Sequence, residues 1–306
     1  MGIEIEPSWV EVSGVSTRYF DTGGPGDPML LVTGGNFGSP EAASTVETWD
    51  RNIPALSERF RVIVIDKLGQ GKTGNPLRDE DYTMQAVCRH IADFVRELDL
   101  RNIHMMGQSR GAMPVAASTM LFPERVKSCT LVNTSTLAPG IGLNEVVLSG
   151  CPYPNYSREA QRWNFERCAY DKSIVTDDFV EAGYEILSQE KYRESCRKMT
   201  TEGLKARYFV PELRKLKTEL LRRIADVGLG RPAQIVWGVK DETATVDRAL
   251  SLFDLIARHD PETQITFMND AAHHPYREHP EHFHQIMFSF LDRVEARSAE
   301  PSRRAA

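Results

Sequence analysis

The sequence predicts an α/β fold in which a mostly parallel sheet carries helices on both faces. Between residues 10 and 132, short runs rich in valine and isoleucine alternate with longer amphipathic segments, a pattern typical of strands and their covering helices. Residues 62–65 are wholly apolar, as expected for a strand buried on both sides. The strand pattern stops after Thr134 and resumes at Ala233, which indicates a helical insertion after the sixth strand.

The elements follow from the spacing of apolar residues. Strands are expected where β-branched residues form short runs, at residues 10–15, 17–21, 29–33, 61–66, 103–107, 126–132, 233–239 and 264–268. Core helices are expected at 44–58, 82–98, 111–122, 246–258 and 281–294; in the second of these, apolar residues recur at helical spacing (Val87, Ile91, Phe94, Leu98). The insertion is expected to hold helices at 157–170, 176–188, 192–204 and 213–224.

These elements divide the chain into three parts. Residues 1–135 and 229–296 are expected to form the core, and residues 136–228 a helical cap that closes over the site. Residues 297–306 are polar and include a proline, so they are expected to form a flexible tail.

Composition excludes several classes of protein. The 306 residues are 41% hydrophobic and 26% charged, within the ordinary globular range. A net charge of −6 provides no field for binding nucleic acid. Five widely spaced cysteines without a C-x-x-C pair indicate neither a disulfide framework nor a zinc knuckle. Because no signal peptide or membrane-length apolar run is visible, the sequence predicts a cytoplasmic protein without a membrane partner.

The strongest motif is G-x-S-x-G at residues 107–111, which lies directly between a predicted strand and a predicted helix. This context is the one required by a nucleophile elbow, a tight turn that exposes a strained serine. Small residues at Gly107 and Gly111 let the strand and the helix approach each other closely. Ser109 is therefore the candidate nucleophile.

A serine hydroxyl needs a histidine base that is oriented by a carboxylate, and on an elbow fold these follow in the order Ser, acid, His. Asp241 directly follows the strand 233–239, with Glu242 and Asp247 as nearby competitors. The other place for the acid, after strand 126–132, holds no carboxylate. His273 follows the last strand and is the candidate base, and the adjacent His274 is expected to face the substrate.

No metal or cofactor is expected. The histidines at 279, 282 and 284 do not share ligand spacing with a cysteine or carboxylate. Gly71, Lys72 and Thr73 suggest a nucleotide loop, but the first glycine of that motif is absent. The developing oxyanion needs two backbone N–H donors; Arg110 is expected to supply the first and Gly35 the second, and Asn36 beside Gly35 is a candidate substrate-binding residue.

With these residues assembled, the chain resembles the α/β-hydrolase superfamily, and within it the meta-cleavage product hydrolases. The resemblance to the latter rests on residues 33–38 (TGGNFG), 51–53 (RNI), 169–176 (AYDKSIVT) and 237–241 (WGVKD). It implies a reaction in which a ring-opened aromatic enol is ketonised with help from the histidine, and the new ketone is cleaved at a carbon–carbon bond. Ser109 would then attack or activate, His273 would move protons, and Asp241 would orient His273.

The substrate-binding residues implied by the resemblance differ from the family pattern. Thr48, Gln108, Gly183 and His274 stand where relatives tend to carry Asn, Asn, Arg and Trp. Glycine at position 183 lacks the guanidinium group with which an arginine would bind the substrate carboxylate in a bidentate manner. Arg110 either supplies the missing charge or pairs with a cap carboxylate.

The remaining expectations concern the ligand and the bond. Trp163, among other cap aromatics, either forms an apolar wall or packs in the cap core. The expected partner is a small, aromatic-derived molecule, and a homodimer or higher homo-oligomer is left open. Two other functions are compatible with the same residues: a carboxylesterase or lactonase, and a non-hydrolytic oxygenase or lyase in which His273 acts as base.

Overall fold

The computed structural model describes residues 5–299 and contains a single eight-stranded sheet. The predicted strands are all present, with ends shifted by a few residues. They are β1 (Ser8–Val12), β2 (Val15–Asp21), β3 (Pro28–Val32), β4 (Arg61–Ile65), β5 (Ile103–Gln108), β6 (Val126–Val132), β7 (Ala233–Gly238) and β8 (Gln264–Met268).

The order of the strands places the functional loops at one edge of the sheet. The order is β1-β2-β4-β3-β5-β6-β7-β8; β2 runs antiparallel to both of its neighbours, β1 and β4, and the strands from β4 to β8 are mutually parallel. The carboxyl ends of parallel strands lie at the same edge, where α/β proteins bind their ligands. The loops after β3, β5, β7 and β8 carry Gly35, Ser109, Asp241 and His273.

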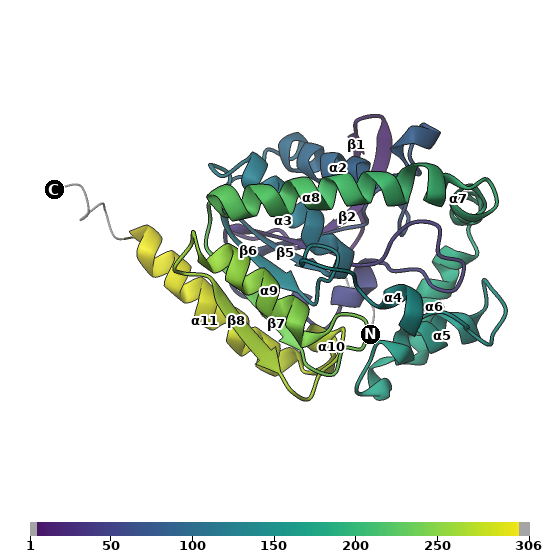
Figure 1. The fold of residues 1–306 in the computed structure, drawn as a ribbon. Coiled ribbons are helices and arrows are strands. Elements are labelled where there is room, and N and C mark those ends of the chain that lie inside the picture. The colour runs from purple at the N-terminus through teal and green to yellow at the C-terminus, as the bar shows by residue number, and fades with distance from the viewer. Residues whose placement is uncertain (1–4, 300–306) are drawn as a thin grey trace.

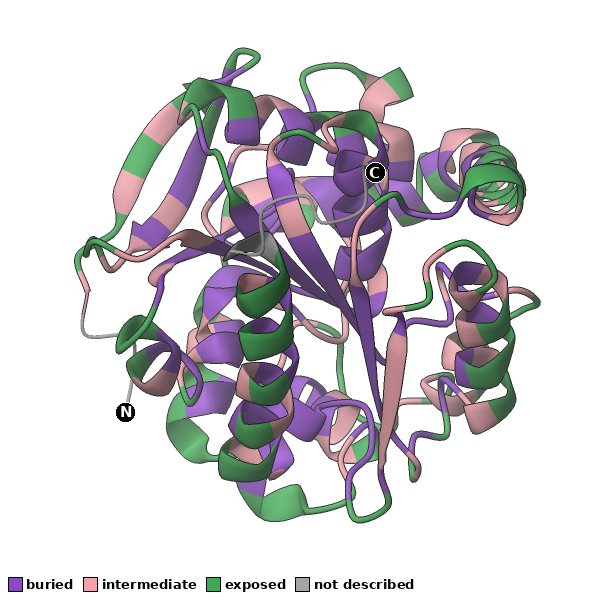
Figure 2. Cartoon of the chain, turned by 90° about the vertical axis from the view of Figure 1, so that its left-hand side faces the viewer, coloured by how far each residue is buried: buried purple, intermediate pink, exposed green. Residues whose placement is uncertain are grey.

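Alternating side chains of the parallel strands enter two separate cores, one on each face. In β3, Leu30 and Val32 belong to one apolar cluster, whereas Met29 and Leu31 belong to the other. The first cluster is covered by α2 (Met84–Glu97), α3 (Ala112–Leu121), α8 (Val210–Val227) and α9 (Val246–Ala257). The second is covered by α1 (Ile53–Ser57), α10 (Pro275–Glu278) and α11 (Pro280–Ala299). The expected two-faced covering is confirmed (Figures 1 and 2).

The segment between β6 and β7 contains helices and no strand within the described residues. It comprises α4 (Asn144–Val147), α5 (Arg158–Arg167), α6 (Asp177–Leu187), α7 (Glu190–Thr200) and α8. Ser157 and Thr176 begin α5 and α6 by accepting hydrogen bonds from backbone N–H groups three residues ahead. The inner side chains of α8, including Leu216 and Leu220, join the core beside α2, so this helix also covers the sheet.

Three expectations need correction. The helix expected at 44–58 is two short helices, a 3₁₀ helix over Val46–Trp49 and α1, because Thr45 begins the first and Pro54 favours a new start at the first turn of the second. Two short helices, α4 and α10, were not expected. The last helix continues to Ala299, three residues into the expected tail; the rest of that tail lies outside the described residues.

None of the described helices combines the length and the apolar character that crossing a membrane requires.

Candidate active site

Ser109 occupies a strained turn between β5 and α3. Its φ is +52°, a left-handed conformation that non-glycine residues rarely adopt. A Cβ atom at Gly107 would collide with the backbone of Gly111, and one at Gly111 would collide with the carbonyl oxygens of Val32 and Thr33. The two glycines of the motif are therefore required by close backbone contacts, and the turn has the geometry of a nucleophile elbow.

His273 and Asp241 come together from the loops after β8 and β7. Nδ1 of His273 lies 2.6 Å from Oδ2 of Asp241, and both side chains are buried. The competing carboxylates lie elsewhere: Glu242 pairs with Arg167, and the exposed Asp247 accepts from Thr245.

The environment of Asp241 keeps this carboxylate ionised. Burial alone would raise its pKa, but His273 and hydrogen bonds from Thr243 and Asn133 together lower the pKa below its usual value. Asn133 donates from Nδ2 to Oδ2 of Asp241 at 2.8 Å and accepts from the N–H of Gly238 at 2.9 Å. Since an ionised carboxylate only accepts, Nδ1 of His273 carries the proton and Nε2 is free to accept one.

Ser109 and His273 line one cavity of about 500 Å³, which we call the Ser109 cavity. Its other walls come from the loop after β3 and from the helical segment, including Phe37, Phe165 and Met199. Among the described residues the Ser109 hydroxyl makes no hydrogen bond, and the His273 ring bonds to Asp241 and Thr243. The bond from Ser109 to Nε2 is thus not formed in this state, and such bonds are often long in the absence of substrate.

The loop after β3 runs directly past Ser109. A Cβ atom at Gly34 would lie 3.0 Å from the Cβ of Ser109, and Gly35 has a φ of +69°. In the described part of the chain the N–H of Gly35 has no hydrogen-bond acceptor. Gly35 and Arg110 both line the cavity, as the expected oxyanion donors should.

Four of the expected substrate-binding residues line the Ser109 cavity: Asn36, Gln108, Arg110 and His274. Nε2 of Gln108 donates to the carbonyl oxygen of His273 at 3.1 Å and so holds the histidine loop. The His274 ring lies against the ring of Phe165. Burial, followed by the charges of His273 and Arg277, holds the pKa of His274 well below its usual value, so the ring is neutral.

Thr48 is not at the cavity, contrary to expectation. It is buried in the 3₁₀ helix, where its hydroxyl donates to the carbonyl oxygen of Thr45 and its own carbonyl accepts from Arg277. These bonds give Thr48 a structural role in holding Arg277.

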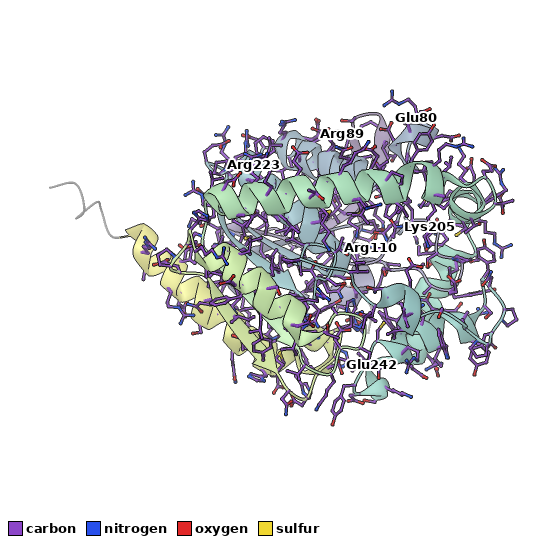
Figure 3. All side chains as sticks on the ribbon, viewed as in Figure 1. Glu80, Arg89, Arg110, Lys205, Arg223 and Glu242 are labelled. Carbon is purple, nitrogen blue, oxygen red and sulfur yellow. The ribbon has the colours of Figure 1, made fainter. Side chains whose placement is uncertain are left out.

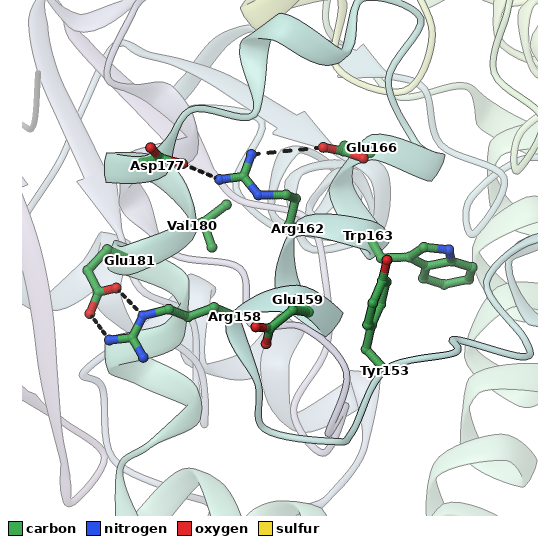
Figure 4. Close-up of a pocket in the computed structure, with 9 residues that line it drawn as sticks. All are labelled: Tyr153, Arg158, Glu159, Arg162, Trp163, Glu166, Asp177, Val180 and Glu181. Carbon is green, nitrogen blue, oxygen red and sulfur yellow. Dashed lines mark hydrogen bonds and ion pairs between the residues drawn. The ribbon is translucent and has the colours of Figure 1, made fainter.

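Trp163 is also not at the cavity. It lines a separate hollow of about 290 Å³ on the helical segment, beside Tyr153 and the ion-paired Arg158 and Arg162 (Figure 4). The neighbours that reach the Ser109 cavity are Asn164 and Phe165. Successive helical residues are rotated by about 100°, so Trp163 points away from the cavity that the next two residues face.

The structure leaves no room for a side chain at Gly183. A Cβ atom there would collide with the amide of Gln161. That amide is fixed, because Gln161 accepts from the N–H of Ala43 at 2.8 Å and donates to its carbonyl oxygen at 3.0 Å. Gln161 therefore occupies the space that a larger side chain at 183 would need.

Sequence reasoning missed Asn133, Thr243 and Glu278. Glu278 accepts hydrogen bonds from the N–H groups of Tyr170, Asp171 and Ala272 at 2.8–2.9 Å. It thereby joins the helical segment to the loop that bears His273. An asparagine at the end of β6, where some relatives place the acid, was the only signal for Asn133.

Among the described residues, one group has the spacing of metal ligands: Asp27, His104 and Glu295. The ammonium group of Lys127 contacts both carboxylates, so a cation already neutralises them. None of the three lines the Ser109 cavity.

Comparison with known proteins agrees with this architecture. The alpha/beta hydrolase fold family matches residues 27–162, which include Gly35 and the Ser109 elbow. The chain therefore has the α/β-hydrolase fold. The candidate histidine and acid, His273 and Asp241, lie beyond the matched residues.

Several relatives that match over nearly their full length are named as dienoate hydrolases. The chain is 26% identical over 290 residues to the 2-hydroxy-6-oxo-6-(2'-aminophenyl)hexa-2,4-dienoic acid hydrolase of Metapseudomonas resinovorans, covering 93% of this chain and 90% of that protein. It is 27% identical over 292 residues to a 2-hydroxy-6-oxononadienedioate/2-hydroxy-6-oxononatrienedioate hydrolase of Escherichia coli K12, covering 93% and 94%. The solved meta-cleavage product hydrolase of Pseudomonas fluorescens IP01 superimposes with a TM-score of 0.75 at 25% identity, covering 95% and 99%. The α/β-hydrolase thus resembles the meta-cleavage product hydrolases.

Proposed function

We propose that this α/β-hydrolase cleaves a carbon–carbon bond in a ring-opened aromatic compound, a vinylogous diketone of the meta-cleavage type. The observation that carries the proposal is the 2.6 Å contact between His273 and Asp241 at the wall of the cavity that also holds the strained Ser109. The names of the full-length relatives support the choice of substrate class.

In the proposed reaction His273 first helps to convert the dienol into its ketone. Oγ of Ser109 then attacks the carbonyl carbon, and its proton passes to Nε2 of His273. The N–H groups of Gly35 and Arg110 hold the oxyanion. The carbon–carbon bond breaks as the dienolate carbon takes the proton back from His273, and water hydrolyses the acyl-serine to release a carboxylic acid.

The side chain of Arg110 is proposed to bind the substrate carboxylate in place of the missing arginine at 183. The Arg110 side chain is half-buried (labelled in Figure 3); the guanidinium faces the ring of Phe209 at 5.7 Å and has no ion-pair partner among residues 5–299. The nearby Glu145 pairs instead with Lys205 at 3.2 Å. A guanidinium without a carboxylate partner can bind one in a bidentate manner.

Residues 136–228 are proposed to act as a lid, because the cavity is closed from that side. Phe165 and Met199 belong to α5 and α7 and line the cavity opposite the sheet. With Phe37 from the loop after β3 they form apolar surface for the aromatic end of the substrate.

Two steady-state assays test the proposed function. Wild-type enzyme is offered a coloured 2-hydroxy-6-oxo-dienoate and, separately, an aryl ester such as p-nitrophenyl acetate. The proposal predicts a higher kcat/KM for the dienoate. Rapid turnover of the ester with no cleavage of the dienoate would contradict it and favour a carboxylesterase or lactonase.

A further inference from the structure

A buried lysine lies behind the loop that carries Gly35. Lys67 stands two residues after β4, and only 2% of its surface is exposed. Burial of a charged ammonium is costly unless its donors are satisfied. None of the sequence motifs described above explains the role of Lys67.

The three protons of this ammonium are shared among three consecutive carbonyl groups. Nζ of Lys67 donates to the carbonyl oxygen of Thr33, to that of Gly34 at 2.7 Å, and more weakly to that of Gly35 at 3.4 Å. No carboxylate is bonded to Nζ in the described part of the chain. Lys67 is therefore a charge held by backbone dipoles.

Because peptide groups are planar, these contacts also fix the directions of the N–H groups on the opposite side of the loop. In a trans peptide the C=O and the following N–H point in opposite directions. Because the carbonyl of Gly34 points at Lys67, the N–H of Gly35 must point away from it. The Gly35 carbonyl turns the N–H of Asn36 away in the same manner.

Strands β4 and β5 flank β3 on opposite sides, so Lys67, which follows β4, and Ser109, which follows β5, lie on opposite sides of the loop after β3. The loop passes against the Cβ of Ser109, Gly35 and Asn36 line the cavity, and the N–H of Gly35 lacks an acceptor. A cation bonded to the carbonyl end of a peptide also polarises its N–H, which strengthens that group as a donor. An oxyanion site requires hydrogen-bond donors that already point to the position where the negative charge develops.

We propose that Lys67 is a positioning residue that orients and polarises the Gly34–Gly35 peptide, so that the N–H of Gly35 stabilises the oxyanion formed on Ser109. The inference rests on the proposed nucleophilic role of Ser109 but not on the identity of the substrate. Lys67 touches no substrate and acts only through the loop.

The charge of Lys67 is sensitive to pH near neutrality. Burial and, to a smaller extent, the charge of Arg110 lower the pKa of Lys67 to about 7, against the opposing effects of Cys88 and Asp66. Of these neighbours, Asp66 is bonded to Arg18, and burial raises the pKa of Cys88 to about 12. Below pH 7 Lys67 is an ammonium with three protons to donate; above it, the neutral amine has two and no charge.

The test uses an aryl boronic acid, in which boron accepts a bond from Oγ of Ser109 while the hydroxyl proton passes to His273, giving a tetrahedral anion. Its affinity is measured calorimetrically for wild type, Lys67→Met and Lys67→Gln from pH 6 to 8, with Ser109→Ala to identify binding that does not involve the serine. Lys191→Met is the matched control, since Lys191 also donates to a backbone carbonyl and has a pKa lowered by burial to about 8, but contacts Thr73.

We expect Lys67→Met to bind the boronate about 10- to 100-fold more weakly at pH 6, within the effect of losing an oxyanion donor, and Lys191→Met to match wild type. The ratio of wild-type to variant affinity should fall as pH rises through about 7, because wild type then loses the same charge. Lys67→Gln, which keeps amide donors without the charge, should show the same pH trend and serves if Lys67→Met does not fold.

Equal affinities at pH 6, or a ratio that does not change with pH, would overturn the inference, as would wild-type binding no tighter than that of Ser109→Ala. Failure of the proposed function is distinguished by the dienoate assay. If the enzyme binds boronate through Ser109 but does not cleave the dienoate, the proposed role of Lys67 stands and only the proposed substrate class is wrong.

Discussion

Asp241 stays ionised although it is buried, because neighbouring groups donate hydrogen bonds to both of its carboxylate oxygens. Its Oδ1 accepts from the backbone and hydroxyl of Thr243 and from the N–H of Ala244, and its Oδ2 accepts from Asn133 and His273. Five hydrogen bonds outweigh the cost of burial, so the carboxylate can hold His273 in a single tautomer.

The sequence predicts the three candidate catalytic residues but not the residues that donate hydrogen bonds to Asp241. Ser109, Asp241 and His273 follow from a motif and from chain order, because their chemistry demands particular residue types in particular loops. Asn133 and Thr243 act only through contacts formed by folding, and many residue types could stand at their positions. The role of Lys67 could not be predicted for the same reason: its partners are backbone carbonyl groups, which leave no pattern in the sequence.

Replacing Arg110 by methionine should weaken binding of a carboxylate substrate while leaving the triad intact. We expect KM for the dienoate to rise at least about tenfold, which corresponds to about 1.4 kcal/mol, because a charge-assisted pair is lost. KM for a neutral aryl ester should change much less. The backbone N–H of residue 110 remains in place as an oxyanion donor.

Steady-state kinetics of Arg110→Met with both substrates checks this prediction. Arg222→Met is the control, since Arg222 is largely exposed on α8 and pairs with Asp226. Equal increases of KM for the two substrates would assign Arg110 a packing role against Phe209 instead of a headgroup role.

At the scale of elements, periodicity predicted which segments are helical better than it predicted which face each helix presents. The sequence left open whether Trp163 forms an apolar wall for the substrate or packs in the cap core; in the structure α5 turns it to a surface hollow and directs Phe165 toward the Ser109 cavity. The helix expected at 44–58 is divided in two, because the N–H of Asn52 donates to the carbonyl oxygen of Trp49, three residues back. This bond ends the first helix.

Glu278 is the residue that couples the helical segment to the histidine loop. Its two carboxylate oxygens accept from the N–H groups of Tyr170, Asp171 and Ala272. Glu278→Gln replaces one of these acceptors with an amide donor, which would face a backbone N–H. We expect a loss of about 1–3 kcal/mol in the free energy of unfolding and a lower kcat, because the loop bearing His273 is less well held.

Urea denaturation and kinetics of Glu278→Gln test this coupling, with the exposed Glu281→Gln as control. Unchanged stability and unchanged kcat would show that the three hydrogen bonds do not position the histidine loop.

For the whole molecule, the buried His90 links folding stability to pH. It lies on α2, its Nε2 is 2.9 Å from the hydroxyl of Thr17, and its Nδ1 has no partner among the described residues. Burial lowers the pKa of His90 to about 4, against an opposing effect of Asp93. Between pH 6.5 and 4 the unfolded chain therefore binds a proton that the folded protein does not, and stability falls as the pH is lowered.

His90→Leu should reduce this loss of stability. The wild-type free energy of unfolding should include a contribution from His90 that decreases by up to about 1.4 kcal/mol per pH unit below pH 6, and the variant should lack it. Urea denaturation at pH 7.5, 6 and 5 measures the difference. Parallel curves of stability against pH would show that His90 takes up its proton as readily in the folded protein as in the unfolded chain.

Single-turnover cleavage of the dienoate by Ser109→Ala tests most directly whether the hydroxyl of Ser109 is the nucleophile. We expect the variant to bind the substrate but to cleave it at least about 10³-fold more slowly than wild type, and Ser251→Ala on α9 to be unaffected. Cleavage by Ser109→Ala within tenfold of the wild-type rate would contradict a nucleophilic role for Ser109 and would assign the chemistry to His273 acting as a base without a covalent intermediate.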